Sequence, residues 1–188
     1  LAEKFLRRGE QEIIVHDPRV IWNIKDVVES NSGTAIQSST GHAFVKKKMR
    51  DYNAIYGGEL SAHHYFRDFA YCDSGMIPWL IVAELLCEKG LRLSDLIGKR
   101  QKKFPSLGEF NFRIKDPEYS IFKLTEHYKQ TCSNVDNLDG ASIEFNSWRF
   151  NVRASNTEPL LRLNLESRGD ENLLQKKKEE IASIILGQ

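Results

Sequence analysis

Short apolar runs alternate with helix-like spacings through the first hundred residues of the chain. Residues 12–16 form a β-branched run, and residues 20–29 follow with apolar side chains at helical spacing. Residues 34–38 repeat the strand pattern, and residues 42–52 repeat the helical one. This order of strand, helix, strand and helix predicts an α/β domain with a parallel or mixed sheet covered by helices.

Two more segments of this first domain have a helical pattern. Residues 76–89 are apolar on several faces, which predicts a well-buried helix. Residues 1–6 mix charged and apolar side chains like the end of an amphipathic helix, and there is no initiator Met. We therefore expect the chain to begin inside a structural element and to be part of a longer protein.

The pattern changes after residues 104–108, which we interpret as a linker that leads into a strand. Asp116 followed by Pro117 is typical of a helix start, because Asp caps free N–H groups and Pro fits the first turn. Strand-like runs then occupy residues 142–145, 148–153 and 160–167, before a last helix that opens at residues 168–170. We predict a smaller α+β domain with an antiparallel sheet, and place the two domains at residues 1–112 and 113–188.

Composition excludes few functions and gives no global reason to expect a nucleic acid or membrane partner. The 188 residues are 40% apolar and 28% charged, with a formal net charge of +1. The longest apolar run, residues 76–87, is too short to span a bilayer, and no signal peptide is visible. The three cysteines lack metal-site spacing, and Cys87 lies in an apolar stretch that predicts burial. A reducing cytoplasm fits this pattern best.

One ten-residue segment concentrates groups that bind phosphate. Arg153 ends a strand, Ser155, Asn156 and Thr157 form a polar turn, and Arg162 returns on the next strand. Forked guanidinium groups, hydroxyls and backbone N–H groups are the donors that hold an anion with three terminal oxygens. If the two arginines face each other across the hairpin, they can grip a phosphate from two sides.

A second interpretation of this segment stays open on composition alone. The arginines could instead form ordinary surface ion pairs with nearby carboxylates, and such pairs are common and contribute little. The candidates for that pairing are Glu144, Glu158 and Glu166.

A second segment, at residues 57–64, is suited to binding hydroxyl groups. Its sequence is Gly-Gly-Glu-Leu-Ser-Ala-His-His. The two glycines permit a sharp turn or a close approach to a ligand. Glu59 and Ser61 would project to the same side of an extended chain, where they could read adjacent sugar hydroxyls. A turn with a capping Glu is the alternative for this string.

Taken together, the two segments resemble loops of the α-D-phosphohexomutase superfamily, which includes phosphomannomutases and phosphoglucomutases. Arg-Ala-Ser-Asn-Thr-Glu-Pro at residues 153–159 is similar to the phosphate-binding loop of that superfamily's last domain. Residues 57–63 are similar to the sugar-binding loop of its third domain. The resemblance covers the whole chain but only the second half of the family pattern.

The resemblance implies roles for individual residues. Glu59, Ser61 and His42 would contact the sugar, and His63 would carry a proton near the transferring phosphoryl group. Arg19 would reach the substrate phosphate, together with the donors of residues 153–162. Ser39 departs from the family, which often has Lys before this Thr-Gly-His segment.

The resemblance also implies that part of the mechanism lies elsewhere. The family's phosphoserine loop and its Asp-Gly-Asp magnesium loop are absent from these residues, and no carboxylate cluster suits Mg²⁺. We expect no metal in this chain, Mg²⁺ in the missing N-terminal half, and a sugar 1,6-bisphosphate as intermediate. The expected activity is that of a phosphomannomutase, with the chain alone inactive.

Two other functions remain possible on the sequence alone. The first is a phosphoglucomutase or an enzyme with both activities. Leu60 favours the phosphomannomutase type, because phosphoglucosamine mutases tend to carry Gln at that position. The second is a stand-alone regulatory module that binds phosphosugars.

Overall fold

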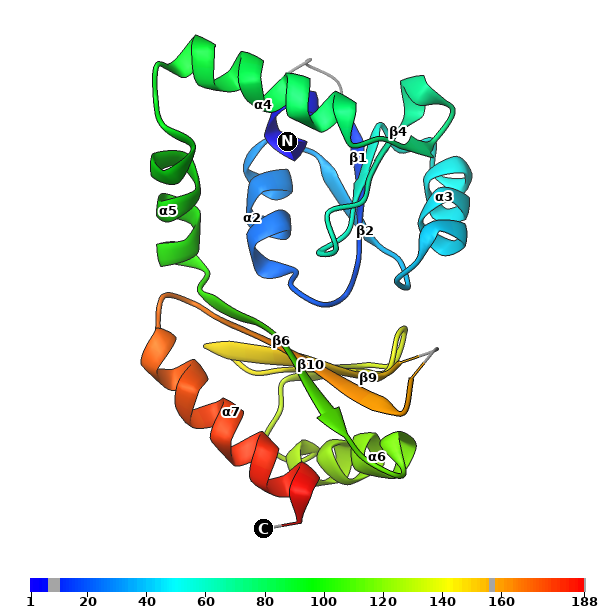
Figure 1. Ribbon diagram of the computed structural model, residues 1–188, viewed down its shortest axis with the longest axis vertical. Coiled ribbons are helices and arrows are strands. Elements are labelled where there is room, and N and C mark those ends of the chain that lie inside the picture. Colours follow the sequence, from blue (N-terminus) through cyan, green and yellow to red (C-terminus); the bar gives the residue numbers. More distant parts are fainter. Residues whose placement is uncertain (7–10, 156–157, 188) are drawn as a thin grey trace. The chain divides into compact units, whose positions relative to one another are not determined.

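The computed structural model describes residues 1–6, 11–155 and 158–187. Contacts divide the chain into two compact units, Leu1–Arg100 and Gln101–Gln188. Each unit has its own five-stranded sheet and its own apolar core (Figure 1). No helix in the described ranges has the length and apolar character needed to cross a bilayer.

The first unit contains a mixed sheet in the order β2-β1-β3-β4-β5. β1 pairs in parallel with β2 and with β3, whereas β3, β4 and β5 pair antiparallel. Its strands are β1 (Ile13–His16), β2 (Thr34–Gln37), β3 (Tyr56–Gly58), β4 (His64–Phe66) and β5 (Cys72–Asp73). Its helices are α1 (Ala2–Leu6), α2 (Trp22–Ser30), α3 (His42–Asp51), the 3-10 turn η1 (Arg67–Phe69), α4 (Met76–Lys89) and α5 (Leu93–Lys103), of which α5 continues into the second unit.

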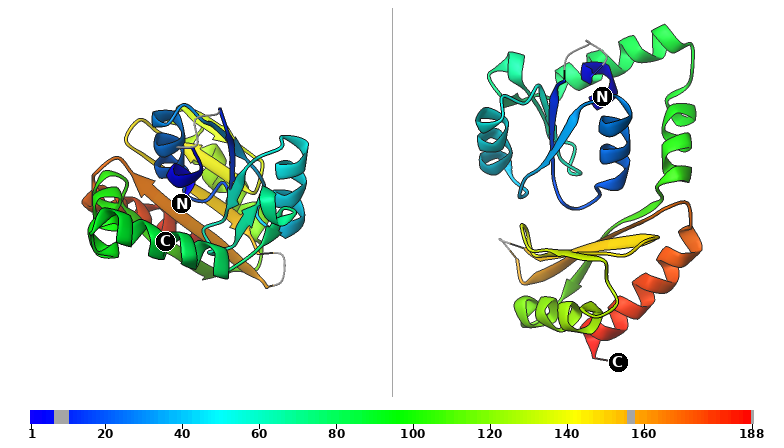
Figure 2. Two further views of the ribbon diagram at one scale, coloured as in Figure 1. Left: turned by 90° about the horizontal axis from the view of Figure 1, so that it is seen from above. Right: turned by 180° about the vertical axis from the view of Figure 1, so that it is seen from behind.

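Helices cover both faces of this sheet, as the views in Figures 1 and 2 show. On one face α1 and α2 bury a cluster that includes Phe5, Val28 and Ile14. On the other face α3 buries Val45 and Met49 against Val15 and Tyr65. The predicted α/β domain with a mixed sheet and covering helices is therefore confirmed.

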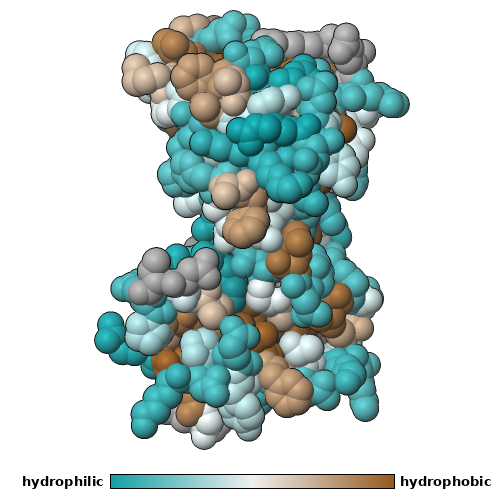
Figure 3. Space-filling model, turned by 90° about the vertical axis from the view of Figure 1, so that its right-hand side faces the viewer, coloured by the Kyte–Doolittle hydropathy of each residue, from teal (hydrophilic) through white to brown (hydrophobic). Residues whose placement is uncertain are grey.

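The prediction that residues 76–89 form a well-buried helix is half wrong. The helix is present as α4, but Pro78 is its one buried residue, whereas Met76, Trp79 and Leu80 are more than half exposed. α4 packs through Ile77 and Ile81 on one side only, and among the described residues nothing buries its other apolar side. Apolar side chains accordingly reach the surface at the top of the first unit (Figure 3). Cys87, on the same helix, is exposed rather than buried.

The second unit is an antiparallel sheet in the order β6-β10-β9-β8-β7 with two helices packed on one face. The strands are β6 (Ser106–Arg113), β7 (Asn134–Asp136), β8 (Ala141–Glu144), β9 (Trp148–Ala154) and β10 (Leu160–Ser167). The helices are α6 (Pro117–Tyr128) and α7 (Glu171–Leu186), and they start where Asp116 and Asp170 accept hydrogen bonds from backbone N–H groups. This confirms the predicted α+β domain and its antiparallel sheet.

The boundary between the units lies earlier than the sequence-based boundary at 112/113. Residues 106–113 form β6, which pairs with β10 and so belongs to the second sheet. Pro105 and Gly108 are typical of irregular chain, which favours the interpretation of residues 104–108 as a linker. The structure begins the strand at Ser106 and accommodates Gly108 near a register shift of the β6–β10 pair.

Side-chain alternation gives the second sheet two different faces. The apolar face packs on α6 and α7 through Phe150 and Val152 of β9 and Leu161, Leu163 and Leu165 of β10. The opposite face carries buried polar side chains of the same two strands. They are Arg149, Asn151, Arg153, Asn164 and Glu166.

Gly140, just before β8, has no room for a side chain. Its φ is +70°, and a Cβ there would lie against the Val152 carbonyl oxygen and 2.7 Å from Arg153 Cα. We expect Gly140→Ala to lower the free energy of unfolding of the second unit by about 2–4 kcal/mol, since backbone strain and overpacking add. Urea unfolding would measure this change.

Gly108→Ala is the matched control for Gly140→Ala. Gly108 also has a positive φ, of +82°, but a Cβ there would meet nothing within 4 Å. Its substitution should therefore cost only the backbone strain, about 1 kcal/mol. Equal losses for the two variants would contradict the steric explanation.

Candidate functional site

In the first unit, Glu59 and Ser61, two of the three predicted sugar residues, lie in the loop that follows β3, next to the end of β1. Glu59 follows β3, and its carboxylate accepts hydrogen bonds from Gly41 N at 3.1 Å and from the Ser61 hydroxyl at 3.2 Å. The Tyr65 hydroxyl donates a third, also at 3.2 Å. Burial and the neighbouring Glu59 carboxylate raise the pKa of Tyr65, which keeps this hydroxyl protonated as a donor.

The local conformation of this loop differs from the expected one. Gly57 and Gly58 lie within β3 rather than in a turn, and Gly57 is where Met49 of α3 packs closely on the strand. The chain turns at residues 59–62, where Ala62 N donates to Glu59 O. Glu59 and Ser61 are thus brought together by a turn, not by an extended segment.

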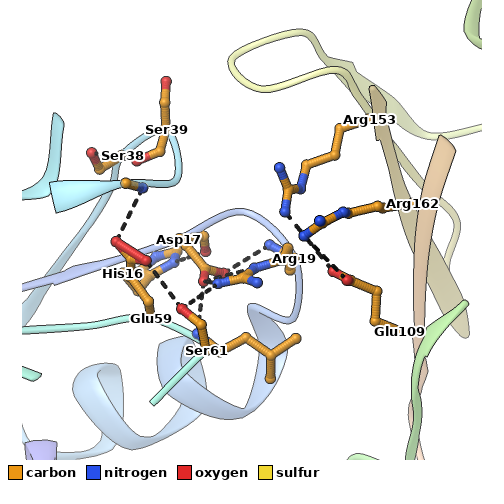
Figure 4. A network of polar contacts seen from close by, with 12 residues as sticks. His16, Asp17, Arg19, Ser38, Ser39, Glu59, Ser61, Glu109, Arg153 and Arg162 are labelled. Carbon is orange, nitrogen blue, oxygen red and sulfur yellow. Dashed lines mark hydrogen bonds and ion pairs between the residues drawn. The ribbon is translucent and has the colours of Figure 1, made fainter. Parts of the chain in front are cut away.

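Arg19 lies beside this loop and is held by a carboxylate that sequence reasoning missed. Asp17 accepts from the Arg19 backbone N at 3.0 Å and from its Nε at 2.9 Å. The same carboxylate accepts from Leu60 N at 2.7 Å, and Arg19 also donates to the Ser61 hydroxyl at 3.3 Å. Figure 4 shows Asp17 between the arginine and the loop, which it therefore ties together. In the sequence, Asp17-Pro18 marks only the end of the β-branched run at residues 12–16.

His42 and His63 form a second group in the same unit. His42 is the first residue of α3, and its ring lies edge-on to that of His63 with a centroid separation of 4.5 Å. Nδ1 of His63 is 2.8 Å from Oδ2 of Asp73, and His42 Nε2 is 3.9 Å from the same oxygen. Asp73, in β5, was not singled out from the sequence, because a lone Asp ten residues beyond His63 has no recognisable pattern.

The electrostatics of Asp73 favour its ionised form. Burial by itself raises the pKa of Asp73, but hydrogen bonds from His64 N and His63, with the charges of His63 and His42, outweigh that effect. The net result is a pKa below the ordinary value for Asp. The group is therefore a carboxylate at neutral pH.

His42, His63 and Asp73 are also the described residues whose donor atoms could hold a metal ion, all within 4.8 Å of one another. Two imidazoles and one carboxylate suit zinc rather than magnesium, which prefers oxygen ligands. In the structure the carboxylate is already engaged by His63.

His64, which had no assigned role, is structural. Its Nδ1 is 2.6 Å from the Tyr56 hydroxyl, and the rings stack at 6.0 Å. Burial lowers the pKa of His64, which favours the neutral ring, and the hydroxyl then donates to Nδ1. Both residues line a pocket of about 220 Å³ that also contains Asp17 and Glu59.

In the second unit, the two predicted arginines are direct partners across neighbouring strands. Arg153 of β9 and Arg162 of β10 are opposite each other in the antiparallel register. Their guanidinium groups lie 3.9 Å and 3.5 Å from the carboxylate of Glu109, on β6 (Figure 4).

The alternative interpretation of this hairpin, ordinary ion pairs with nearby carboxylates, is met in part. The guanidinium group of Arg162 also lies 3.8 Å from the carboxylate of Glu158. Of the three carboxylates named from the sequence as possible partners, Glu158 is near, whereas Glu166 pairs with Arg149.

The polar turn between these arginines is described only in part. Ser155 N donates to Leu160 O at 2.8 Å, which closes the hairpin. Asn156 and Thr157, named as phosphate donors, lie outside the described residues. Glu109 has no recognisable link to the arginines in the sequence, because it precedes them by more than forty residues and lies just beyond the segment that we interpret as a linker.

Comparison with known proteins agrees with both halves of this description. Residues 1–104 match the family model for phosphoglucomutase/phosphomannomutase, alpha/beta/alpha domain III, and residues 109–184 match that for the phosphoglucomutase/phosphomannomutase C-terminal domain. A phosphomannomutase of Escherichia coli is 52% identical over 98% of the chain, and the phosphohexose mutases of Xanthomonas campestris are 49% identical over 100% of it.

A solved structure of a phosphoglucomutase/phosphomannomutase family protein from Burkholderia thailandensis superposes with a TM-score of 0.76 at 26% identity. That superposition covers 98% of this chain and 40% of the Burkholderia chain. The chain likewise spans 41% of the Escherichia relative and 42% of the Xanthomonas relative. The chain thus belongs to the phosphoglucomutase/phosphomannomutase family and corresponds to its third, α/β/α domain and its C-terminal domain.

Proposed function

We propose that this chain is the sugar- and phosphate-binding part of a phosphomannomutase that interconverts mannose 6-phosphate and mannose 1-phosphate. The observation that carries the proposal is the pairing of Arg153 and Arg162 across β9 and β10. Two guanidinium groups on adjacent strands form a site for a dianion that neither would form alone. The names of relatives such as the Escherichia phosphomannomutase support the same assignment.

At the phosphate end, Glu109 keeps the two arginines together. Its carboxylate lies within 4 Å of both guanidinium groups, which reduces their mutual repulsion. An incoming phosphate brings more negative charge and more acceptor oxygens than one carboxylate. It can therefore add charge-assisted hydrogen bonds to donors that are already oriented, at little further cost in side-chain entropy.

At the sugar end, Glu59 is the group we assign to hydroxyl recognition. Its carboxylate is fixed by Gly41 N, Ser61 and Tyr65, so its remaining acceptor positions are defined in space.

Three neighbouring residues would add further contacts to the substrate. Ser61 would add a second contact to the sugar, His42 would contact the same sugar, and Arg19 would reach the substrate phosphate. Asp17 fixes Arg19 for that role.

His63 is the residue we assign to proton transfer, since an imidazole can both accept and donate a proton. We propose that it takes the proton from the sugar hydroxyl that accepts the phosphoryl group and returns it in the reverse direction. Positioning by the surrounding residues would supply much of the rate enhancement.

The nucleophile and the metal are assigned to the remainder of the full-length protein. The metal-capable group among the described residues has two nitrogen donors and one carboxylate, which do not fit Mg²⁺. We propose that Mg²⁺ and the phosphorylated serine lie outside this chain. A sugar 1,6-bisphosphate would then reorient between the two half-reactions while the arginine pair accepts either phosphate.

A second activity is favoured by one relative. The Xanthomonas proteins are named phosphohexose mutases, a description that is not restricted to mannose. Leu60, which would discriminate between sugars, is 48% exposed at the tip of the loop, where it can meet a ligand. Phosphoglucomutase activity alongside phosphomannomutase activity is therefore the second candidate.

A coupled assay tests this proposal. The full-length protein should convert mannose 1-phosphate with a kcat of about 1–10³ s⁻¹, whereas the 188-residue chain alone should show no turnover because it lacks the phosphoryl donor. Glucose 1-phosphate in the same assay measures the second activity. Absence of turnover of both sugars by the full-length protein would contradict the enzyme assignment, and steady turnover by the chain alone would contradict the division of roles.

A further inference from the structure

Asp73 uses its two carboxylate oxygens for different partners. Oδ1 accepts a hydrogen bond from His64 N at 2.8 Å, which fixes the carboxylate against β4. The β4–β5 ladder, in which Tyr65 is opposite Asp73, holds the same residue from the backbone side. Oδ2 is left to face Nδ1 of His63 at 2.8 Å. The side chain is 25% exposed, so it is partly shielded from water.

The chemistry of this contact identifies which nitrogen of His63 carries the hydrogen. A carboxylate only accepts hydrogen bonds, so the hydrogen in the 2.8 Å contact belongs to Nδ1 of the imidazole. In the neutral ring, Nε2 then has the free lone pair. His63 is 41% exposed, so its ring is accessible to a ligand.

His42 reinforces the same arrangement. Its Nε2 is 3.9 Å from Asp73 Oδ2, and its ring packs edge-on against His63. The ring of His63 is therefore confined on two sides, by a hydrogen bond at Nδ1 and by an aromatic contact. This leaves the orientation of Nε2 fixed before any substrate arrives.

We propose that Asp73 is a positioning residue for the proton carrier: it holds His63 in the tautomer with hydrogen on Nδ1, so that Nε2 exchanges the proton with the sugar hydroxyl. The role in turnover rests on the proposed mutase function, but the tautomer does not. During the forward step Nε2 gains the hydroxyl proton and the imidazolium forms, with its Nδ1–H still donated to Asp73. The reverse step returns the proton to the sugar oxygen.

Asp73→Asn makes the sharpest test because it changes the donor pattern and keeps the shape. With Oδ1 still accepting from His64 N, the group facing His63 becomes an NH₂ that can only donate. Nδ1 must then accept, and the hydrogen moves to Nε2, the nitrogen required as the base. Asp73→Glu retains an acceptor and should retain the native tautomer at least in part.

The experiment is ¹⁵N NMR of histidine-labelled full-length protein, with a chelator present because His42, His63 and Asp73 could bind a transition metal. His63→Gln identifies the His63 signals by their loss. We expect the neutral native ring to show a protonated Nδ1 and Asp73→Asn to show a protonated Nε2. A neutral native ring with its hydrogen on Nε2 would overturn the inference, whether or not the variants fold.

Steady-state kinetics of the same proteins test the consequence for turnover. Asp73→Asn should lower kcat roughly 10–100-fold, within what general acid–base catalysis contributes, and change KM by no more than about twofold. Asp73→Glu should recover part of kcat. The control is Asp51→Asn, which removes a partly exposed carboxylate of the same unit that pairs with Lys47 and should leave kcat unchanged.

The results separate this inference from the mutase assignment. A native protein without mutase activity but with Nδ1 protonated would leave the orientation in place and contradict the proposed function. A native mutase whose kcat is unchanged in a folded Asp73→Asn protein would contradict the positioning role and leave the proposed function standing.

Discussion

Replacing Arg149 with Met should lower the free energy of unfolding of the second unit by about 3–5 kcal/mol, the typical effect of breaking a buried ion pair. Arg149 and Glu166 lie opposite each other on β9 and β10, with Nη1 and Oε1 2.8 Å apart. Their side chains are 1% and 0% exposed. Removal of the arginine leaves the Glu166 carboxylate buried without that cation, and water cannot replace it without opening the sheet.

Urea unfolding with probes in each unit would measure this effect, because the first unit should be unaffected. The double variant Arg149→Met with Glu166→Leu should regain most of the lost stability, since two apolar groups leave no uncompensated charge. Arg113→Met, at an exposed position of β6, is the matched control and should change stability by less than about 0.5 kcal/mol. A loss below 1 kcal/mol for Arg149→Met would show that the pair contributes no more than a surface ion pair.

Arg153→Lys should weaken phosphosugar binding by the full-length protein about tenfold or more, because each charge-assisted hydrogen bond contributes about 1.5–3 kcal/mol. Lys keeps the positive charge beside Glu109 but lacks the planar fork that engages two oxygens at once. The effect should therefore appear in KM for mannose 1-phosphate, with the stability of the second unit nearly unchanged.

Two comparisons make the Arg153 result interpretable. Arg162→Lys, on the partner strand, should have an effect of the same order, because the two groups are opposite each other. Arg113→Lys, at its exposed position on β6, should have none. An unchanged KM in both Arg153→Lys and Arg162→Lys would mean that these arginines serve only the ion pairs with Glu109.

Much of the fold could be predicted because the strands and helices of this chain carry strong periodic signals. Leu161, Leu163 and Leu165 alternate with polar residues, and all three are fully buried in the core of the second unit. Asp116 and Asp170 begin their helices where capping chemistry predicts. The strands β3, β4, β5 and β7 escaped prediction because they are two or three residues long and lack a periodic pattern.

The candidate site was predictable only where its residues are close in sequence. The loop that holds Glu59 and Ser61, and the hairpin that holds Arg153 and Arg162, each form a local pattern. Their partners do not, because strand pairing brings them in from a distance. Asp73 reaches His63 through the β4–β5 ladder, and Glu109 reaches the arginines through the β6–β10 pair.

The extent of exposure of α4 was unpredictable for a different reason. An apolar helix indicates that something covers it, but the pattern does not say whether the cover belongs to the same stretch of chain. Trp79 and Leu80 keep an apolar surface exposed in the described part of the chain. Val45 and Met49 of α3 are fully buried, by contrast, because their partners lie within the same unit.

The two-faced sheet of the second unit links correct strand pairing to the proposed phosphate site. Along β9, residues that fill the core alternate one by one with polar residues from Trp148 to Arg153, and the first and last of these polar residues, Arg149 and Arg153, are arginines. A shift of one residue in the pairing of β9 would exchange the two sets. The guanidinium groups would then lie among the core leucines, and Phe150 would lie on the polar face. A misaligned hairpin is therefore unstable, because it would bury charged groups in the apolar core. The same geometry limits which substitutions the polar positions of β9 can accept. Mutations that loosen the pairing should impair folding and ligand binding together.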